Sequence, residues 1–427
     1  MYRYWNQQNY NSFTYDATGL IPTNPASTLT SAPFNTAGPL GAGYTGVDKL
    51  NSYVTKGNIF RATKDFTNGT LRTGLWYDVA KSYRHQLPSV PGSWLDAATP
   101  LFSETYTTTT IQPYLEYEFK ATDALKVTPG LKYASYNQNF NHLADNGKAV
   151  GPLGCTYNKT NGTITGTGCA SSISNSITYT DVLPSLDAHY QLQPNWAVYG
   201  QYAEGDAIPP TNVFDVKNAA VDTPPKATKS QTFQIGSVWK SDQYTLDVDV
   251  YHIKLDSPYS QTTDASGNAV FTLNGSQINQ GIEVESNIML NGGFSLYLNG
   301  TVGTAKFDTG LWVAGAPSNT ETLGLNYQQA EWNTGLFAKR VGTLYNDNGS
   351  THQAFTIDPV VLTNLFVNYS IKNPTNFAKQ AKVQFGVNNL FNKHSIVGVA
   401  TVGTTSSADL LTITPARSTS LTLKLDF

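Results

Sequence analysis

The sequence carries little charge. Only 13% of its 427 residues are Asp, Glu, Lys or Arg, about half the share of an ordinary soluble protein. The formal net charge is -3, which gives no basic surface for nucleic acid. No run of eighteen apolar residues occurs, and the first ten residues, MYRYWNQQNY, have no apolar core of a signal peptide. If the chain crosses a membrane, we expect it to do so as strands.

Spacings typical of metal sites and enzyme motifs are also absent. The six histidines are scattered, with no His-x-x-x-His and no paired Cys/His spacing, so we expect no metal site. No Gly-Lys-Ser/Thr phosphate loop or Gly-x-Ser-x-Gly elbow occurs, and we expect neither a cofactor nor an enzyme. Asp247 and Asp249 share one strand face and could form a general acid/base pair. Solvated charges facing a lumen explain them better.

Alternating apolar and polar residues are abundant. The last residues, STSLTLKLDF, place Leu421, Leu423, Leu425 and Phe427 on one face of an extended strand. Fifteen segments of this kind can be counted along the chain, each near the length of a tilted membrane-spanning strand. Aromatic residues reach 12%, with 25 Tyr and 19 Phe, and suit a surface that is partly out of water.

The connections between these segments alternate strictly between short and long. The short links KDFTNG, LQPN and KSDQ are followed by long connections over residues 80–107, 204–229 and 254–280, respectively. Short turns at one rim and long loops at the other are typical of outer-membrane barrels. Because hydrocarbon offers no partner to backbone groups, such a sheet must close. We therefore predict an all-β, transmembrane, antiparallel up-and-down barrel of 15 or 16 strands, with the leucine face toward the lipid bilayer.

The closing residues resemble a known family. VNNLFNKHSIVG at 387–398, followed by TPARSTSLTLKLDF, is similar to the last two strands of TonB-dependent outer-membrane receptors. The resemblance implies a bacterial outer-membrane location, a 22-stranded barrel around a plug, and active uptake of a scarce nutrient, most often a ferric siderophore, through the TonB complex. It also implies that Phe427 is the terminus used by the outer-membrane assembly machinery.

The same resemblance predicts how the chain is divided. Residues 1–52 are expected to form an extracellular loop region with room for one strand in MYRYWNQQNY, and residues 53–427 the receptor-type barrel strands. Fifteen crossings that end at the periplasmic rim would start outside the cell, whereas a barrel chain starts in the periplasm. We therefore expect a C-terminal part of a longer protein, with at least one strand missing or hidden in MYRYWNQQNY. The resemblance implies about seven further strands and a plug ahead of it.

Two sets of side chains are candidates for binding and cross-linking. Cys155 and Cys169 lie in one long predicted external loop, where a disulfide is expected in an oxidising compartment; the alternative is two free thiols. Substrate contacts are expected from long loops, where arginine can grip oxygen anions and aromatic rings can cover a flat ligand. The candidates are Arg84, His85, Trp94, Trp312, Arg340, Tyr345 and His352. The alternative is that they anchor the rim or carry solvated charge.

Other functions stay open at this point. A receptor of the same type could take up cobalamin or a carbohydrate. A passive porin would be favoured by a sixteenth strand and a loop folded into the lumen, and disfavoured by a plug-sized space in the pore. A soluble β adhesin or β enzyme would be extracted without detergent.

Overall fold

The computed structural model describes residues 2–15, 46–90, 95–96, 102–142, 156–158, 163–165, 173–209, 225–256, 258–263, 269–273, 275–345, 356–375, 377–400 and 410–427. These residues form one large antiparallel sheet and three small hairpins. Within them, no helix is long and apolar enough to cross a membrane.

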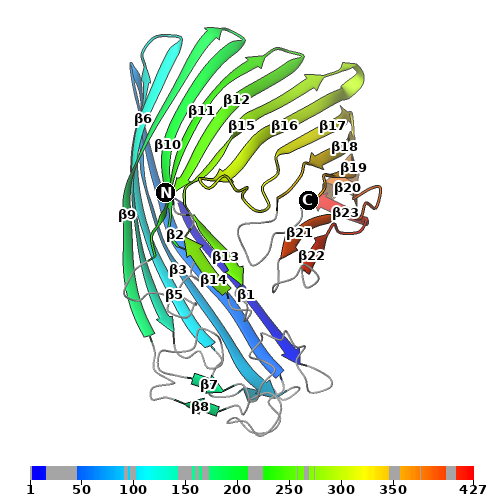
Figure 1. Ribbon diagram of the computed structural model, residues 1–427. Helices are drawn as coiled ribbons and strands as arrows, with labels where there is room; N and C mark the ends of the chain where they lie inside the picture. Colours follow the sequence, from blue (N-terminus) through cyan, green and yellow to red (C-terminus); the bar gives the residue numbers. More distant parts are fainter. Residues whose placement is uncertain are drawn as a thin grey trace.

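The large sheet follows the order of the chain (Figure 1). Its strands are β1 (Tyr2–Tyr15), β2 (Gly46–Phe66), β3 (Gly69–Val90), β4 (Leu95–Asp96), β5 (Phe102–Lys120), β6 (Leu125–His142), β9 (Ile173–Gln193), β10 (Trp196–Ala207), β11 (Thr228–Lys240), β12 (Tyr244–Asp256), β15 (Gln277–Met289), β16 (Phe294–Phe307), β17 (Asn319–Gln329), β18 (Trp332–Val341), β19 (Val360–Thr375), β20 (Ala378–Asn388) and β23 (Ser418–Asp426). The hairpins are β7–β8 (Thr156–Asn158, Thr163–Thr165), β13–β14 (Tyr259–Thr263, Ala269–Leu273) and β21–β22 (Ile396–Ala400, Leu410–Ile413).

The predicted up-and-down arrangement is confirmed. Seventeen strands make the sheet, and β4 has only two residues, so sixteen long strands remain. Each pairs antiparallel with its neighbour along the chain, from β1–β2 through to β20–β23. The sheet is curved but not closed: among the described residues, β1 pairs only with β2, and β23 only with β20.

The two faces of the sheet differ as the alternation predicts. On one face, large apolar side chains stand exposed, for example Ile235 at 67%, Val302 at 64% and Leu115 at 52%. Residues opposite one another in an antiparallel pair share a face. The register therefore places Gln234 and Tyr251 together on the other face, and Asp249 with Glu283. This second face carries most of the polar side chains, and we call it the polar face.

The polar face is the concave one. On a concave surface side chains converge, so they can reach past a neighbouring strand. The hydroxyl of Tyr199 on β10 donates a hydrogen bond of 3.1 Å to Asp247 on β12, past β11. The apolar face is therefore convex, where side chains diverge and stay exposed. This is the arrangement expected for a wall with lipid outside and water inside.

Aromatic residues mark the rim that carries the short turns. On the convex side, pairs of rings lie where neighbouring strands meet their tight turns. The pairs are Trp196 with Trp239 (centroids 5.7 Å apart), Phe294 with Tyr327 (4.8 Å), Trp332 with Tyr369 (4.7 Å) and Phe377 with Phe427 (6.2 Å). Such a belt is typical of the membrane interface of outer-membrane barrels. The C-terminal Phe427 is part of it.

At the opposite rim, several strands extend farther than the sequence predicts. Residues 80–107 were expected to be one long loop, but β3 continues to Val90 and β5 starts at Phe102. The alternation that predicts a strand fades here because both faces are polar in this segment. A strand that has left the hydrocarbon no longer needs an apolar face, and its backbone bonds alone extend the sheet.

Candidate functional site

The polar face between β11 and β17 is acidic. Asp249 lies directly opposite Glu283, and Asp247 opposite Glu285, across the β12–β15 pair. We call these four carboxylates the acidic strip. Directly opposed carboxylates repel each other, and no lysine, arginine or histidine nitrogen of the described residues lies within 4.0 Å of them.

The prediction that both aspartates are solvated is wrong for one of them. Asp249 is only 9% exposed, and among the described residues its Oδ1 atom has no hydrogen-bond partner. The alternation along one strand shows that Asp249 lies on the same face as Asp247. It does not reveal that the Tyr199 ring of another strand crosses over Gly236.

Next to the acidic strip, Tyr251 lies against two glycines. A Cβ atom added at Gly281 or at Gly303 would lie 2.9 Å from the Tyr251 hydroxyl. The register places Tyr251 opposite Gly281, and Gly281 opposite Gly303. The tyrosine side chain therefore spans two strands, which only residues without a side chain permit. Aromatic residues are known to cover glycines in sheets in this way.

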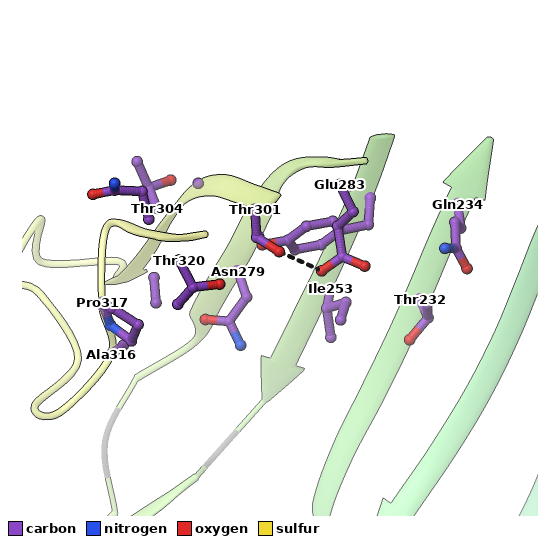
Figure 2. A pocket seen from close by; sticks show the side chains of 14 residues that line it. Thr232, Gln234, Ile253, Asn279, Glu283, Thr301, Thr304, Ala316, Pro317 and Thr320 are labelled. Carbon is purple, nitrogen blue, oxygen red and sulfur yellow. Dashed lines mark hydrogen bonds between the residues drawn. The ribbon is translucent and has the colours of Figure 1, made fainter. Parts of the chain in front are cut away.

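Tyr251 is one of the residues that line a pocket of about 450 Å³, which Figure 2 shows from close by. Its size falls in the range of small-molecule sites. Of the described residues that line it, Glu283 alone carries a formal charge, and its Oε1 accepts a hydrogen bond of 3.4 Å from Thr301. The other polar lining residues are Thr232, Gln234, Tyr251, Asn279, Thr304, Asn319 and Thr320. Hydroxyls and amides both donate and accept hydrogen bonds, so the pocket suits a polar ligand.

The connection between β16 and β17, residues 308–318, forms the roof of this pocket. It folds back over the polar face, and Ala316 and Pro317 line the pocket from that side (Figure 2). Val313 donates a backbone hydrogen bond to Ala305, and Gly303 donates one to Ser318, each of 2.9 Å. These bonds attach the roof to the top of β16.

Two of the predicted contact residues meet in this roof. Trp312 stacks on Tyr345, with centroids 4.4 Å apart and planes at 14°. The ammonium group of Lys306 lies 5.2 Å from the Trp312 ring centre. Since Gly315 also donates a backbone hydrogen bond of 2.8 Å to Tyr345, the next external connection supports the roof.

Arg84 and His85 lie within β3 rather than in a loop. As neighbours on a strand they point to opposite faces. Arg84 pairs with the fully buried Glu104 at 3.5 Å, whereas His85 contacts the Tyr83 hydroxyl at 3.1 Å. The two candidates therefore lie on opposite faces of the sheet, and β3 is several strands away from the pocket.

Arg340 is also a strand residue, on β18. Its Nη1 atom donates hydrogen bonds of 2.9 and 3.1 Å to the two carboxylate oxygens of Glu321. Glu321 lies opposite Gly300 and two residues from Leu323, which is 53% exposed on the convex face. The pair thus lies on the convex side. Trp94, His352, Cys155 and Cys169 lie outside the described residues.

The pocket residues themselves escaped prediction from the sequence. Gln234, Tyr251, Glu283 and Thr301 come from four different strands, and only the pairing register brings them together. A partial signal exists in the glycines at 281 and 303, which interrupt alternating segments. Among the described residues, no group of three or more His, Cys, Asp or Glu side chains has the arrangement of metal ligands.

Comparisons with known proteins agree with this architecture. The chain superposes on the ferric yersiniabactin uptake receptor FyuA from Yersinia pestis with a TM-score of 0.68 and 17% identity, over 90% of this chain and 55% of that one. It superposes on the copper transporter OprC with a TM-score of 0.70 and 14% identity, over 100% of this chain and 62% of that one. It superposes on the siderophore receptor PiuA from Acinetobacter baumannii with a TM-score of 0.61 and 14% identity, over 89% of this chain and 56% of that one.

At these identities the likeness shows the fold alone, and the chain spans 55% of the length of FyuA. No curated protein matches the sequence. A family model, however, matches residues 2–390, and it describes the TonB-dependent receptor-like β-barrel. With sixteen tilted strands, an aromatic rim and a family match over most of its length, this chain belongs to the TonB-dependent receptors of the bacterial outer membrane.

Proposed function

We propose that this chain forms the ligand-binding wall of an outer-membrane receptor that takes up a ferric siderophore, with energy supplied through TonB. The roofed pocket on the polar face supports the proposal, because it offers a small polar molecule a defined binding site on the inside of the wall. Two similar folds belong to a ferric yersiniabactin receptor and a siderophore receptor.

In this proposal a ligand arrives at the rim with the long connections and descends along the polar face. The hydroxyls and amides around Tyr251 bind its polar groups, and the roof separates it from the space above. Trp312 and Tyr345 hold the roof and are the proposed contacts nearest to the pocket. Arg84, His85, Trp94 and His352 remain proposed contacts, and Cys155–Cys169 a proposed disulfide. Arg340 is no longer proposed as a contact, because it pairs with Glu321 on the convex side.

Uptake of iron-55 by living cells tests this function. The gene is deleted from its own locus, and a second strain lacks TonB. Cells with the intact gene should accumulate a labelled ferric siderophore at nanomolar concentration, and both mutant strains should lose this uptake. Cobalamin and a labelled oligosaccharide are tested in parallel. If uptake of cobalamin or of the oligosaccharide depends on the gene and iron uptake does not, that ligand, and not a ferric siderophore, is the substrate.

Passive diffusion through a porin is the second candidate, because the sixteen long strands and the inward-folded residues 308–318 are features expected of a porin. The family match argues against it, because the model that matches residues 2–390 describes the TonB-dependent receptor-like β-barrel. Planar bilayers separate the two candidates. A porin would give stable open channels without TonB, and its substrate flux would rise linearly with concentration.

A further inference from the structure

The acidic strip lacks a positive partner in the part of the chain that the structure describes. Glu283 is exposed at the edge of the pocket, and Asp249 is buried directly opposite it with Oδ1 unbonded. A buried carboxylate oxygen without a partner is costly, and the repulsion between the two opposed carboxylates adds to this cost. A cation bound at Glu283 would offset the repulsion between the two carboxylates.

We propose that the pocket selects a positively charged cargo, one in which a protonated amine binds Glu283 while hydroxyl or amide groups fill the pocket. This inference rests on the proposed siderophore uptake and names the class of siderophore. Within that class it favours ferric complexes with a cationic side arm over anionic catecholate or carboxylate complexes.

The lining of the pocket supports this selection. Glu283 supplies the only formal charge, and the remaining polar groups are hydroxyls and amides. Among the described residues that line the pocket none is positively charged. An anionic chelate would therefore meet Glu283 there, with the three other carboxylates of the acidic strip on the same two strands. An ammonium group would find a charge-assisted hydrogen bond to Glu283, which is stronger than a neutral one. Asp249 adds negative potential from below without touching the ligand.

Tyr251 fixes where the amine can lie. Its side chain occupies the space over Gly281 and Gly303, so the floor of the pocket is closed on that side. The hydrogen bond from Thr301 holds one oxygen of Glu283, which leaves the other oxygen for the ligand. The two groups together orient one carboxylate oxygen toward the pocket.

Three matched probes test the charge preference. The probe is a ferric linear trihydroxamate whose terminal amine is free, acetylated or succinylated, so that the charge changes by one unit at each step and the iron centre stays the same. Binding to the full chain, purified in detergent at low salt, is followed by quenching of tryptophan fluorescence. We expect the free amine to bind about tenfold more tightly than the acetylated form, and the succinylated form to bind most weakly.

Variants then assign the preference to the acidic strip. Glu283→Gln should bring the ratio between amine and acetylated probes close to one, and Asp249→Asn should reduce it. Asp426→Asn removes an exposed carboxylate at the far end of the sheet, on β23, and should leave the ratio unchanged. Heat-modifiable mobility shows that each variant is folded. If Asp249→Asn does not assemble, the binding ratio of Glu283→Gln still tests the assignment, because the Glu283 side chain is exposed.

Two results would overturn the inference. One is tighter binding of the succinylated probe, which would leave siderophore uptake intact but assign it an anionic cargo. The other is an unchanged amine preference in Glu283→Gln. If none of the three probes binds, the proposed siderophore function fails together with the charge selection, and this outcome is distinct from a reversed order.

Discussion

The hydroxyl of Tyr199 donates a hydrogen bond of 3.1 Å to Asp247, although an entire strand lies between them. The contact is possible because residue 236 of the intervening strand is glycine. A Cβ atom added there would lie 2.3 Å from the Tyr199 ring. Glycine therefore allows a polar tyrosine to tie three strands together on the inner wall.

Gly236→Ala should consequently destabilise the barrel. The new methyl group displaces the tyrosine ring, and Asp247 loses its donor. Overpacking of this kind costs about 1 to 3 kcal/mol. Urea unfolding in detergent micelles, followed by tryptophan fluorescence, measures the loss.

Gly200→Ala is the matched control for that substitution. Gly200 is the next residue after Tyr199, but a Cβ atom there has its nearest neighbour at 3.9 Å, an ordinary contact distance. We expect a change within about 0.5 kcal/mol. Equal losses in the two variants would show that the crossing of Tyr199 over Gly236 contributes nothing specific.

The assignment of faces predicts opposite outcomes for lysine at neighbouring positions. Ile235 is 67% exposed on the convex face, so Ile235→Lys should place a charge in hydrocarbon at a cost of about 2 to 4 kcal/mol. Gln234→Lys places the same charge on the wet inner face and should assemble normally. The amount of heat-modifiable protein in outer membranes is the measurement. Similar yields for the two variants would contradict the assignment.

The roof of the pocket should depend on Trp312. Trp312→Ala removes both the stacking on Tyr345 and the contact with Lys306, each worth about 0.5 to 1.5 kcal/mol. We expect faster proteolytic cleavage within residues 308–318. Leu311→Ala is the control, because Leu311 is 53% exposed. Cleavage at the rate of the unmodified chain in Trp312→Ala would assign the stability of the roof to its backbone bonds alone.

The predicted disulfide between Cys155 and Cys169 has a direct test. Oxidation in the outer membrane should leave neither thiol free. Denatured, unreduced protein should therefore not react with a maleimide, and reduction should expose two reactive groups. Labelling before reduction would show that the cysteines are unpaired.

The fold could be predicted from the sequence because its signals are local. The alternation in STSLTLKLDF and its counterparts follows from the two-residue period of a strand, and loop length alternates with every crossing. Both survive in a single sequence without knowledge of which strands pair. The upper ends of β3 and β5 escaped prediction because the apolar face disappears above the membrane.

The pocket could not be predicted in the same way. Tyr251 and Gly303 are 52 positions apart in the sequence, and their contact depends on the register of β12, β15 and β16. The fold of residues 308–318 depends on Tyr345, which belongs to another connection. Such relationships arise only once the sheet has formed.

The unequal strand lengths give the molecule an oblique mouth. The 22 residues of β3 extend about 70 Å and, at the usual tilt, rise roughly 50 Å, whereas the 10 residues of β18 rise roughly 23 Å. The aromatic pairs hold the short-turn rim at one membrane surface. Relative to an apolar band of about 25 Å, one side of the wall therefore projects some 25 Å beyond the band, and the β18 side ends level with it. A diffusing solute would thus meet the tall side outside the cell before it reached the plane of the membrane.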